Sequence, residues 1–173
     1  MKNLLLSFVV SIAALSLSAC GFALRGNVSF STELTNLQLS IEQPSSEFAR
    51  LLKGSLESAG VAINLIDSIG TAESESGIAI LLVTNEQVVS RPVTVNARAR
   101  AAQYELSMSI TIALGKNASY IIEPESLVVQ RIYFEDIENI SGNREEVEII
   151  SAEMRHELVG QLIRRLDAVG MSI

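Results

Sequence analysis

The only cysteine of the chain, Cys20, is the residue whose side chain most clearly offers covalent chemistry. It lies directly after an almost wholly apolar run, Leu4 to Leu17, and directly before Gly21. A cysteine thiolate is a nucleophile that can accept a diacylglycerol group. Because a single cysteine cannot form an internal disulfide, covalent modification is the better explanation for a thiol at this point.

The residues before Cys20 have the pattern of a secretory signal peptide. Lys2 gives a short positive start, and the apolar run falls short of the roughly 20 residues that a membrane-spanning helix needs. Leu17-Ser18-Ala19-Cys20 resembles the lipobox of bacterial lipoproteins, so we expect removal of residues 1–19 and a diacylglycerol and an N-acyl chain on Cys20. The alternative is an ordinary signal peptide with an incidental cysteine, and the lipobox register argues against it. Gly21, where Asp often signals inner-membrane retention, favours the outer membrane.

The remaining residues offer little for catalysis. His156 is the only histidine, and we expect it on the solvated face of the last helix between two glutamates. The sequence has no Cys/His cluster with metal-ligand spacing, no glycine-rich phosphate loop and no nucleophile elbow. We therefore predict a protein that is not an enzyme, with no catalytic residues, no metal and no cofactor beyond the lipid on Cys20.

The charge distribution points to one local exception in an acidic chain. The net charge is −7, which becomes −8 when Lys2, the only charged residue of the leader, is removed, so nucleic acid is not an expected partner. Residues 87–104 nevertheless contain no acidic residue and include Arg91, Arg98 and Arg100. Arginine forks match phosphate oxygens well. The alternative is a charged hairpin tip that keeps a sheet edge from aggregating, and both interpretations stay open.

The apolar spacing predicts an α+β domain over residues 20–173. A helix is expected to begin after Ser45 or Ser46 and to end at Gly60, and a last helix to begin at Asn143 and end at Gly170. The expected strands are residues 37–41, 61–66, 78–83, 103–114 and 126–135, with a turn at 115–119. Strict alternation over 103–114 predicts one buried face, with Leu106 and Ile110 against Leu158 and Leu162. The helices should cover one face of a mostly antiparallel sheet.

Four segments together resemble the LptE family of lipopolysaccharide-assembly lipoproteins. "CGFALRG" at 20–26 is similar to the mature start of the family, although Ala23 stands where His is common. "AAQYELSMSITIAL", "VQRIYF" and "MRHELVGQLIRRL" resemble its central strand, the following strand and its C-terminal helix, in the same order. The resemblance implies two helices packed on one face of a four-stranded, mostly antiparallel sheet.

The resemblance also implies a non-enzymatic function in the outer membrane of Gram-negative bacteria. Family members plug the β-barrel of LptD, assist its assembly and bind lipopolysaccharide. We therefore expect a lipid-anchored protein on the periplasmic side of the outer membrane or inside the barrel lumen. The serine- and threonine-rich face of residues 103–111 would suit a polar lumen. The alternative function is a generic periplasmic lipoprotein scaffold or chaperone of envelope assembly.

Lipopolysaccharide carries phosphates, so a protein that binds it needs clustered positive charge. The strongest candidates are Arg91, Arg98 and Arg100, because the window without acidic residues isolates them from internal neutralisation. Arg144 is a secondary candidate, expected in the loop before the last helix, where the adjacent Asn143 occupies a place that is Lys in some members. Arg131 is weaker, because an arginine in the middle of a strand can simply face solvent.

The anchor gives a direct prediction. Mass spectrometry of the mature N-terminus should find acylated Cys20 and no trace of residues 1–19, because the lipobox directs both modification and cleavage. A Cys20→Ser variant should lose the acyl chains. An unmodified Cys20 or an intact Met1 in the mature protein would show that the lipobox is incidental.

Overall fold

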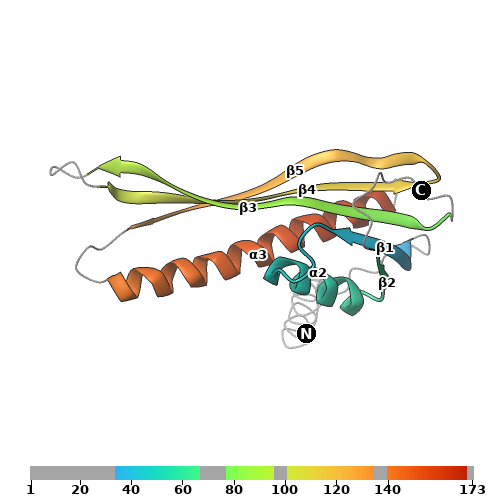
Figure 1. The fold of residues 1–173 in the computed structure, drawn as a ribbon, viewed down its shortest axis with the longest axis horizontal. Coiled ribbons are helices and arrows are strands. Elements are labelled where there is room, and N and C mark those ends of the chain that lie inside the picture. Colours follow the sequence, from blue (N-terminus) through green and yellow to red (C-terminus); the bar gives the residue numbers. More distant parts are fainter. Residues whose placement is uncertain (1–33, 67–76, 96–100, 135–139, 171–173) are drawn as a thin grey trace, which may run out of the picture.

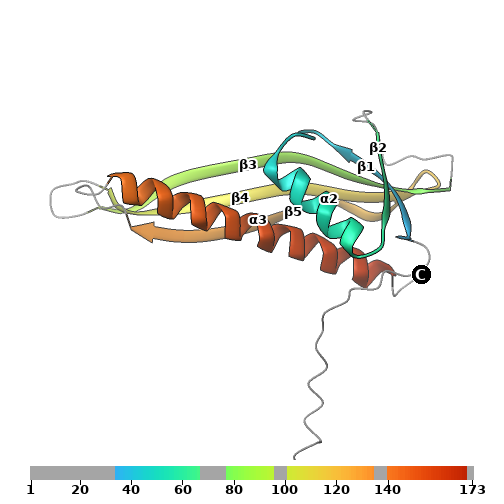
Figure 2. The same cartoon turned by 90° about the horizontal axis from the view of Figure 1, so that it is seen from below.

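The computed structural model describes residues 34–66, 77–95, 101–134 and 140–170 as one α+β unit. A five-stranded sheet has the order β2-β1-β3-β4-β5, and both helices lie on the same face of it (Figures 1 and 2). The elements follow in the order β1 (Asn36–Ile41), α2 (Glu47–Ser58), β2 (Ala62–Leu65), β3 (Ala79–Val95), β4 (Ala101–Lys116), β5 (Ser119–Phe134) and α3 (Ile140–Gly170).

The sheet is mixed and has one strand more than the four that the family resemblance implies. β1 runs parallel to both β2 and β3, whereas β3, β4 and β5 form long antiparallel pairs. The β1–α2–β2 segment is a crossover connection, which returns β2 to the sheet parallel to β1. The predicted α+β class is confirmed, and the predicted count of four strands is wrong because the segment at 61–66 joins the sheet.

The strand predicted at residues 78–83 is only the first part of β3, which continues to Val95. Residues 87–95 of this continuation are exposed on both faces of the sheet. They therefore lack the run of buried apolar residues on which the prediction of a strand at 78–83 depended. Register shifts occur between Thr84 and Gln87 and again around Pro92. Proline is tolerated there because this part of β3 is an edge strand with an irregular register, two settings in which a strand accommodates proline.

Beyond Val83, β3 loses its β1 neighbour, and the sheet narrows to a three-stranded arm. We call this part the distal arm: residues 84–95 of β3, 101–111 of β4 and 126–134 of β5. The N-terminal half of α3 runs along the arm, while α2, β1 and β2 cover only the other half of the molecule (Figures 1 and 2).

The core lies between the inner face of the sheet and the two helices. Alternation along β4 is confirmed, since Leu106, Met108, Ile110 and Ile112 are buried while the intervening polar residues are partly exposed. The helices contribute the following buried side chains: Phe48, Ala49, Leu52, Leu56, Met154, Leu158, Val159, Leu162 and Leu166. The predicted packing of Leu158 and Leu162 into this core is confirmed.

The helix ends follow the predicted signals at α2 and at Gly170, where α3 ends, but the start of α3 differs from the prediction. Ser46 caps α2, its Oγ accepting a hydrogen bond from the Ala49 N–H at 3.0 Å, and Gly60 beyond the helix has φ +85°, which suits glycine. The last helix begins at Ile140, so Asn143 is inside it and does not cap it. The apolar spacing that supported the prediction begins only at Val147, so the first turns carried no signal.

The core predicts a large difference between two substitutions in α3. Leu158→Ala should lower the free energy of unfolding by about 2–5 kcal/mol, because it leaves a cavity beneath the sheet. Glu153→Ala, at an exposed position of the same helix, should change it by less than about 0.5 kcal/mol. Chemical denaturation measures both values, and equal losses would contradict the assigned buried face.

Candidate functional site

Both described helices lie on one face of the sheet, which leaves its opposite face uncovered by them (Figure 1). We call it the outer face. Its centre is a column of polar side chains on β4, each partly exposed: Gln103, Glu105, Ser107, Ser109 and Thr111. A face of this composition is compatible with water or with a polar binding partner.

Arg91 lies on this outer face and is bound to an acidic residue. It is the register partner of Glu105, whose Oε1 accepts hydrogen bonds from Arg91 Nε at 2.8 Å and Nη2 at 2.7 Å. Gln130 Nε2 donates to the same oxygen at 3.4 Å. The expectation that Arg91 escapes internal neutralisation is therefore wrong. Glu105 follows the acid-free window by one residue, and strand pairing brings it opposite Arg91.

The other predicted site residues are only partly placed. Cys20 lies in residues 1–33, and Arg98 and Arg100 lie in residues 96–100, all outside the described residues. Arg144 is exposed within the early turns of α3 and not in the preceding loop. Arg91 and Arg144 both belong to the distal half of the molecule, but α3 packs on the inner face, so the two arginines lie on opposite sides of the sheet (Figures 1 and 2).

Three ion pairs connect α3 to its neighbours. Arg165 binds Glu125 of β5 through Nε and Nη2, at 2.6 and 2.7 Å. Arg131 of β5 binds Glu157, so it faces the helix and not free solvent. Arg155 reaches Glu47 of α2 at 2.9 Å. Sequence spacing could not reveal these pairs, because their partners lie far apart in the chain.

The contact between Glu125 and Arg165 alters the pKa of both side chains. The two-point hydrogen bond from Arg165 lowers the pKa of Glu125, partial burial opposes this effect, and the charge of Arg165 lowers the pKa further. The same hydrogen bond raises the pKa of Arg165. The Arg165 side chain is 52% exposed and the Glu125 side chain 30% exposed, so solvent screens the pair and its contribution to stability is modest.

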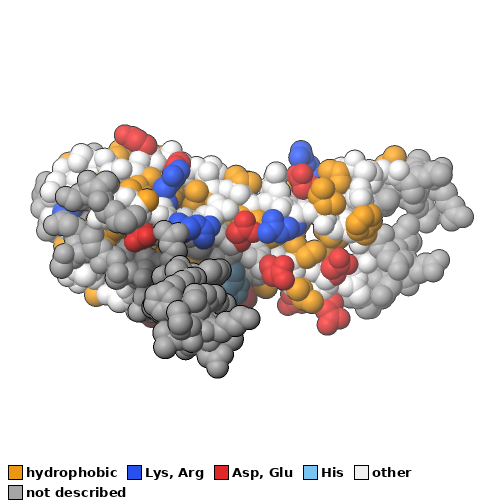
Figure 3. Space-filling model, turned by 180° about the vertical axis from the view of Figure 1, so that it is seen from behind, with side chains coloured by type: hydrophobic (Ala, Val, Ile, Leu, Met, Phe, Trp, Pro, Cys, Tyr) orange, Lys and Arg blue, Asp and Glu red, His pale blue; other side chains and the backbone are white. Residues whose placement is uncertain are grey.

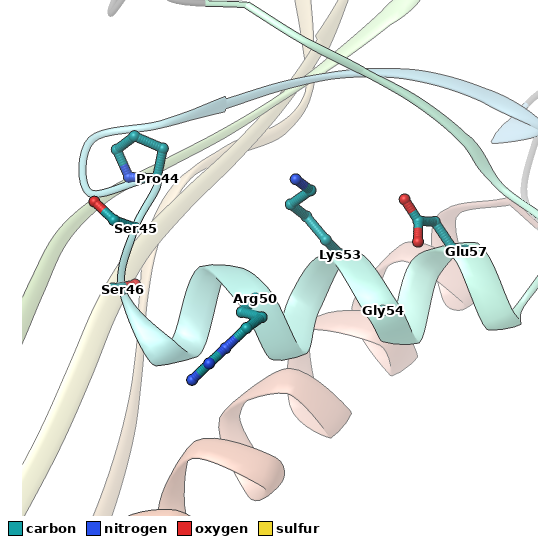
Figure 4. A pocket seen from close by; sticks show the side chains of 7 residues that line it. All are labelled: Pro44, Ser45, Ser46, Arg50, Lys53, Gly54 and Glu57. Carbon is teal, nitrogen blue, oxygen red and sulfur yellow. The ribbon is translucent and has the colours of Figure 1, made fainter.

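An open hollow of about 430 Å³ lies on the outward side of α2, far from the distal arm. It is lined by Pro44, Ser45, Ser46, Arg50, Lys53, Gly54 and Glu57. Figure 4 shows that Lys53 and Arg50 point away from each other. One helix and the loop before it form the whole lining, so the charged groups do not converge on a ligand.

The described residues contain no evident cluster of catalytic or metal-binding side chains. His156 is exposed on α3, with Nδ1 2.9 Å from the carbonyl oxygen of Ala152. No group of three or more His, Cys, Asp or Glu side chains in these residues is arranged to hold a metal ion. Among the helices described, none has the length and apolar character needed to cross a bilayer.

Comparison with known proteins identifies a family. The family model described as "LptE: Lipopolysaccharide-assembly" matches residues 34–166. An LPS-assembly lipoprotein LptE from Photorhabdus laumondii is 25% identical over 171 residues, covering 96% of this chain and 87% of that protein. The LPS-assembly lipoprotein LptE of Yersinia pestis is 25% identical over 166 residues, covering 96% of this chain and 77% of the relative.

Solved structures share the fold. The rare lipoprotein B from Shewanella oneidensis superposes with a TM-score of 0.66 at 17% identity, covering 79% of this chain and 97% of that one. A lipoprotein B from Nitrosomonas europaea gives a TM-score of 0.60 at 20% identity, covering 86% and 91% of the two chains. At these identities the likeness concerns the architecture alone.

The Arg165–Glu125 pair predicts a pH effect on stability. A carboxylate whose folded pKa lies below its ordinary value of about 4.3 stabilises the fold above that pH, and the contribution is lost as the pH falls through the folded pKa. Glu125→Gln should therefore lose less stability than the wild type between about pH 5 and pH 3. Thermal unfolding at several pH values measures this.

The matched control is Glu153→Gln, which removes an exposed carboxylate from α3 itself. It should keep the pH dependence of the wild type. Identical pH profiles for the wild type and Glu125→Gln would show that the pair does not influence folding in solution.

Proposed function

The chain belongs to the LptE lipopolysaccharide-assembly family, and from this premise we propose that it is the lipoprotein subunit of a complex that delivers lipopolysaccharide to the cell surface. Its partner is the LptD β-barrel, which it helps to assemble and then plugs. The family match over residues 34–166 carries the proposal, because it includes all five strands, α2 and most of α3.

The proposed anchor is the acylated Cys20, which holds the domain at the periplasmic side of the outer membrane. More than one acyl chain is needed for firm attachment, since a single chain binds a bilayer only marginally. Residues 21–35 separate the anchor from β1, so the domain stays close to the membrane surface. The protein is thereby available to a barrel embedded in the same membrane.

The shape and polarity of the sheet support the role of a plug. β3 has 17 residues and is at most about 55 Å long, well above the roughly 25 Å apolar band of an outer-membrane barrel. An elongated domain of this kind can lie along a barrel axis. The polar column of β4 on the outer face is complementary to a lumen that is itself polar.

Lipopolysaccharide phosphates are the proposed ligands of Arg91, Arg98 and Arg100, with Arg144 as a secondary contact. Arg91 uses Nε and Nη2 to hold Glu105, which leaves Nη1 for a phosphate oxygen. Its guanidinium remains largely exposed, so a ligand can reach it without displacing a buried group.

The proposal predicts what the full chain carries when it leaves the membrane. Extraction in mild detergent followed by affinity isolation should recover a large β-barrel protein and lipopolysaccharide. The Arg98→Ser/Arg100→Ser variant should keep the barrel and retain about tenfold less lipopolysaccharide, because each exposed arginine contact contributes up to ~1 kcal/mol. The difference should shrink at high salt, which screens exposed charges.

Arg50→Ser is the control, since Arg50 is an exposed arginine on α2, outside the distal arm. It should change neither the barrel nor the lipopolysaccharide recovered. Isolation of the wild type without any barrel protein would instead favour the alternative function, a general scaffold or chaperone of the envelope. Unchanged lipopolysaccharide in the folded double variant would assign these arginines to protection of the sheet edge.

A further inference from the structure

The distal arm carries most of the large hydrophobic side chains that the described residues expose. Three of the ten, Leu65, Tyr120 and Ile149 of α3, lie elsewhere. The others are Val88, Val89, Val93, Val95, Val128, Ile132 and Phe134. Figure 3 shows hydrophobic side chains edged by charged ones on the arm side of the molecule, at the right of the view. Exposed hydrophobic side chains that are concentrated on one half of a small domain indicate an interaction site.

Three of these side chains lie along β5 on the outer face, with the polar Gln130 between Val128 and Ile132. Val128, Ile132 and Phe134 are 46%, 60% and 65% exposed. Their register partners on β4 are Ser109, Glu105 and Gln103, the polar column of the outer face, so all three point away from the helices. We call them the β5 strip. It extends for about 20 Å along an edge strand and is one side chain wide.

The β5 strip runs beside a basic group. Arg91, Glu105 and Ile132 are successive register partners across three strands, so they form one row of the outer face. Neighbouring strands are about 4.8 Å apart, which places the Arg91 backbone about 10 Å from that of Ile132. Glu105 lies between Arg91 and Ile132 and takes up Nε and Nη2 of the arginine, but the Arg91 side chain is 63% exposed and Nη1 is not used in this pair. An anionic headgroup can therefore bind the outward side of Arg91 while the chains of the same amphiphile lie on the strip.

We propose that the β5 strip binds acyl chains of lipopolysaccharide while its phosphates lie toward Arg91. This inference rests on the proposed function and assigns a second part of the ligand to a second set of residues. The lumen of an outer-membrane barrel is polar and offers no apolar complement to the strip. Three side chains are also far too small an area for a stable dimer, which needs about 800 Å² from each partner.

Photo-crosslinking in living cells tests the strip in the full-length, membrane-anchored chain. A photoreactive phenylalanine analogue is introduced at Ile132, at Phe134 and, as a control, at Val88. Val88 is 55% exposed on the same arm, but its register partner Met108 is buried, so it points to the other side of the sheet. Lipopolysaccharide adducts should form at 132 and 134 and be about tenfold weaker at 88.

A pair of polar variants gives a second readout. Ile132→Ser/Phe134→Ser should reduce the lipopolysaccharide recovered with the complex about tenfold, because it removes apolar contact area, and Val88→Ser should not. All three substitutions are at exposed positions, so the thermal unfolding midpoint should stay near that of the wild type. Unchanged recovery with the double variant would overturn the inference.

The adducts also distinguish this inference from the proposed function. Exclusive cross-links from 132 and 134 to the barrel wall, or to a second copy of the chain, would refute acyl-chain binding. If the wild type still carries barrel and lipopolysaccharide in that case, the proposed function stands and only the strip is reassigned. If the wild type carries neither, the proposed function itself fails.

Discussion

Side-chain alternation along β4 is the constraint on which the rest of the molecule depends. Both helices pack on one face, so every second residue of the central strand must be apolar and its neighbours must tolerate exposure. A shift of one residue would bury Glu105 and Ser107 and expose Leu106 and Met108. The inner face of the sheet therefore forms the core with the helices, and the outer face stays available for contacts outside the domain.

The ion pairs maintain this division. Arg165–Glu125 and Arg131–Glu157 hold α3 against β5 along the inner side, whereas Arg91–Glu105 lies on the outer face. The inner pairs fix the position of a helix. The outer pair orients the Arg91 guanidinium, which keeps donors that this pair does not use. The same type of contact thus leaves Arg91 able to donate to the proposed ligand, whereas Arg131 and Arg165 have a structural role.

The sequence allowed prediction of the elements with an amphipathic pattern and missed those without one. Alternation over residues 103–114, the Ser46 cap and Gly60 were all sufficient signals, because each reflects a local physical preference. The strand expected at 78–83 is too short, because the exposed half of β3 is stabilised by pairing with β4 and not by burial. The Glu105 contact to Arg91 was missed for the same reason: only strand register brings the two residues together.

Strand direction places the start of the described domain and the proposed lipid-binding surface at opposite ends of the molecule. β1 runs parallel to β3 with Leu37 beside Ala79, so the chain from Cys20 enters the domain near the start of β3. The distal arm lies at the opposite end, near Val95. The roughly 15 residues between anchor and sheet can extend at most about 50 Å. The proposed anchor at Cys20 therefore joins the described domain at one end, whereas the proposed amphiphile surface belongs to the other end.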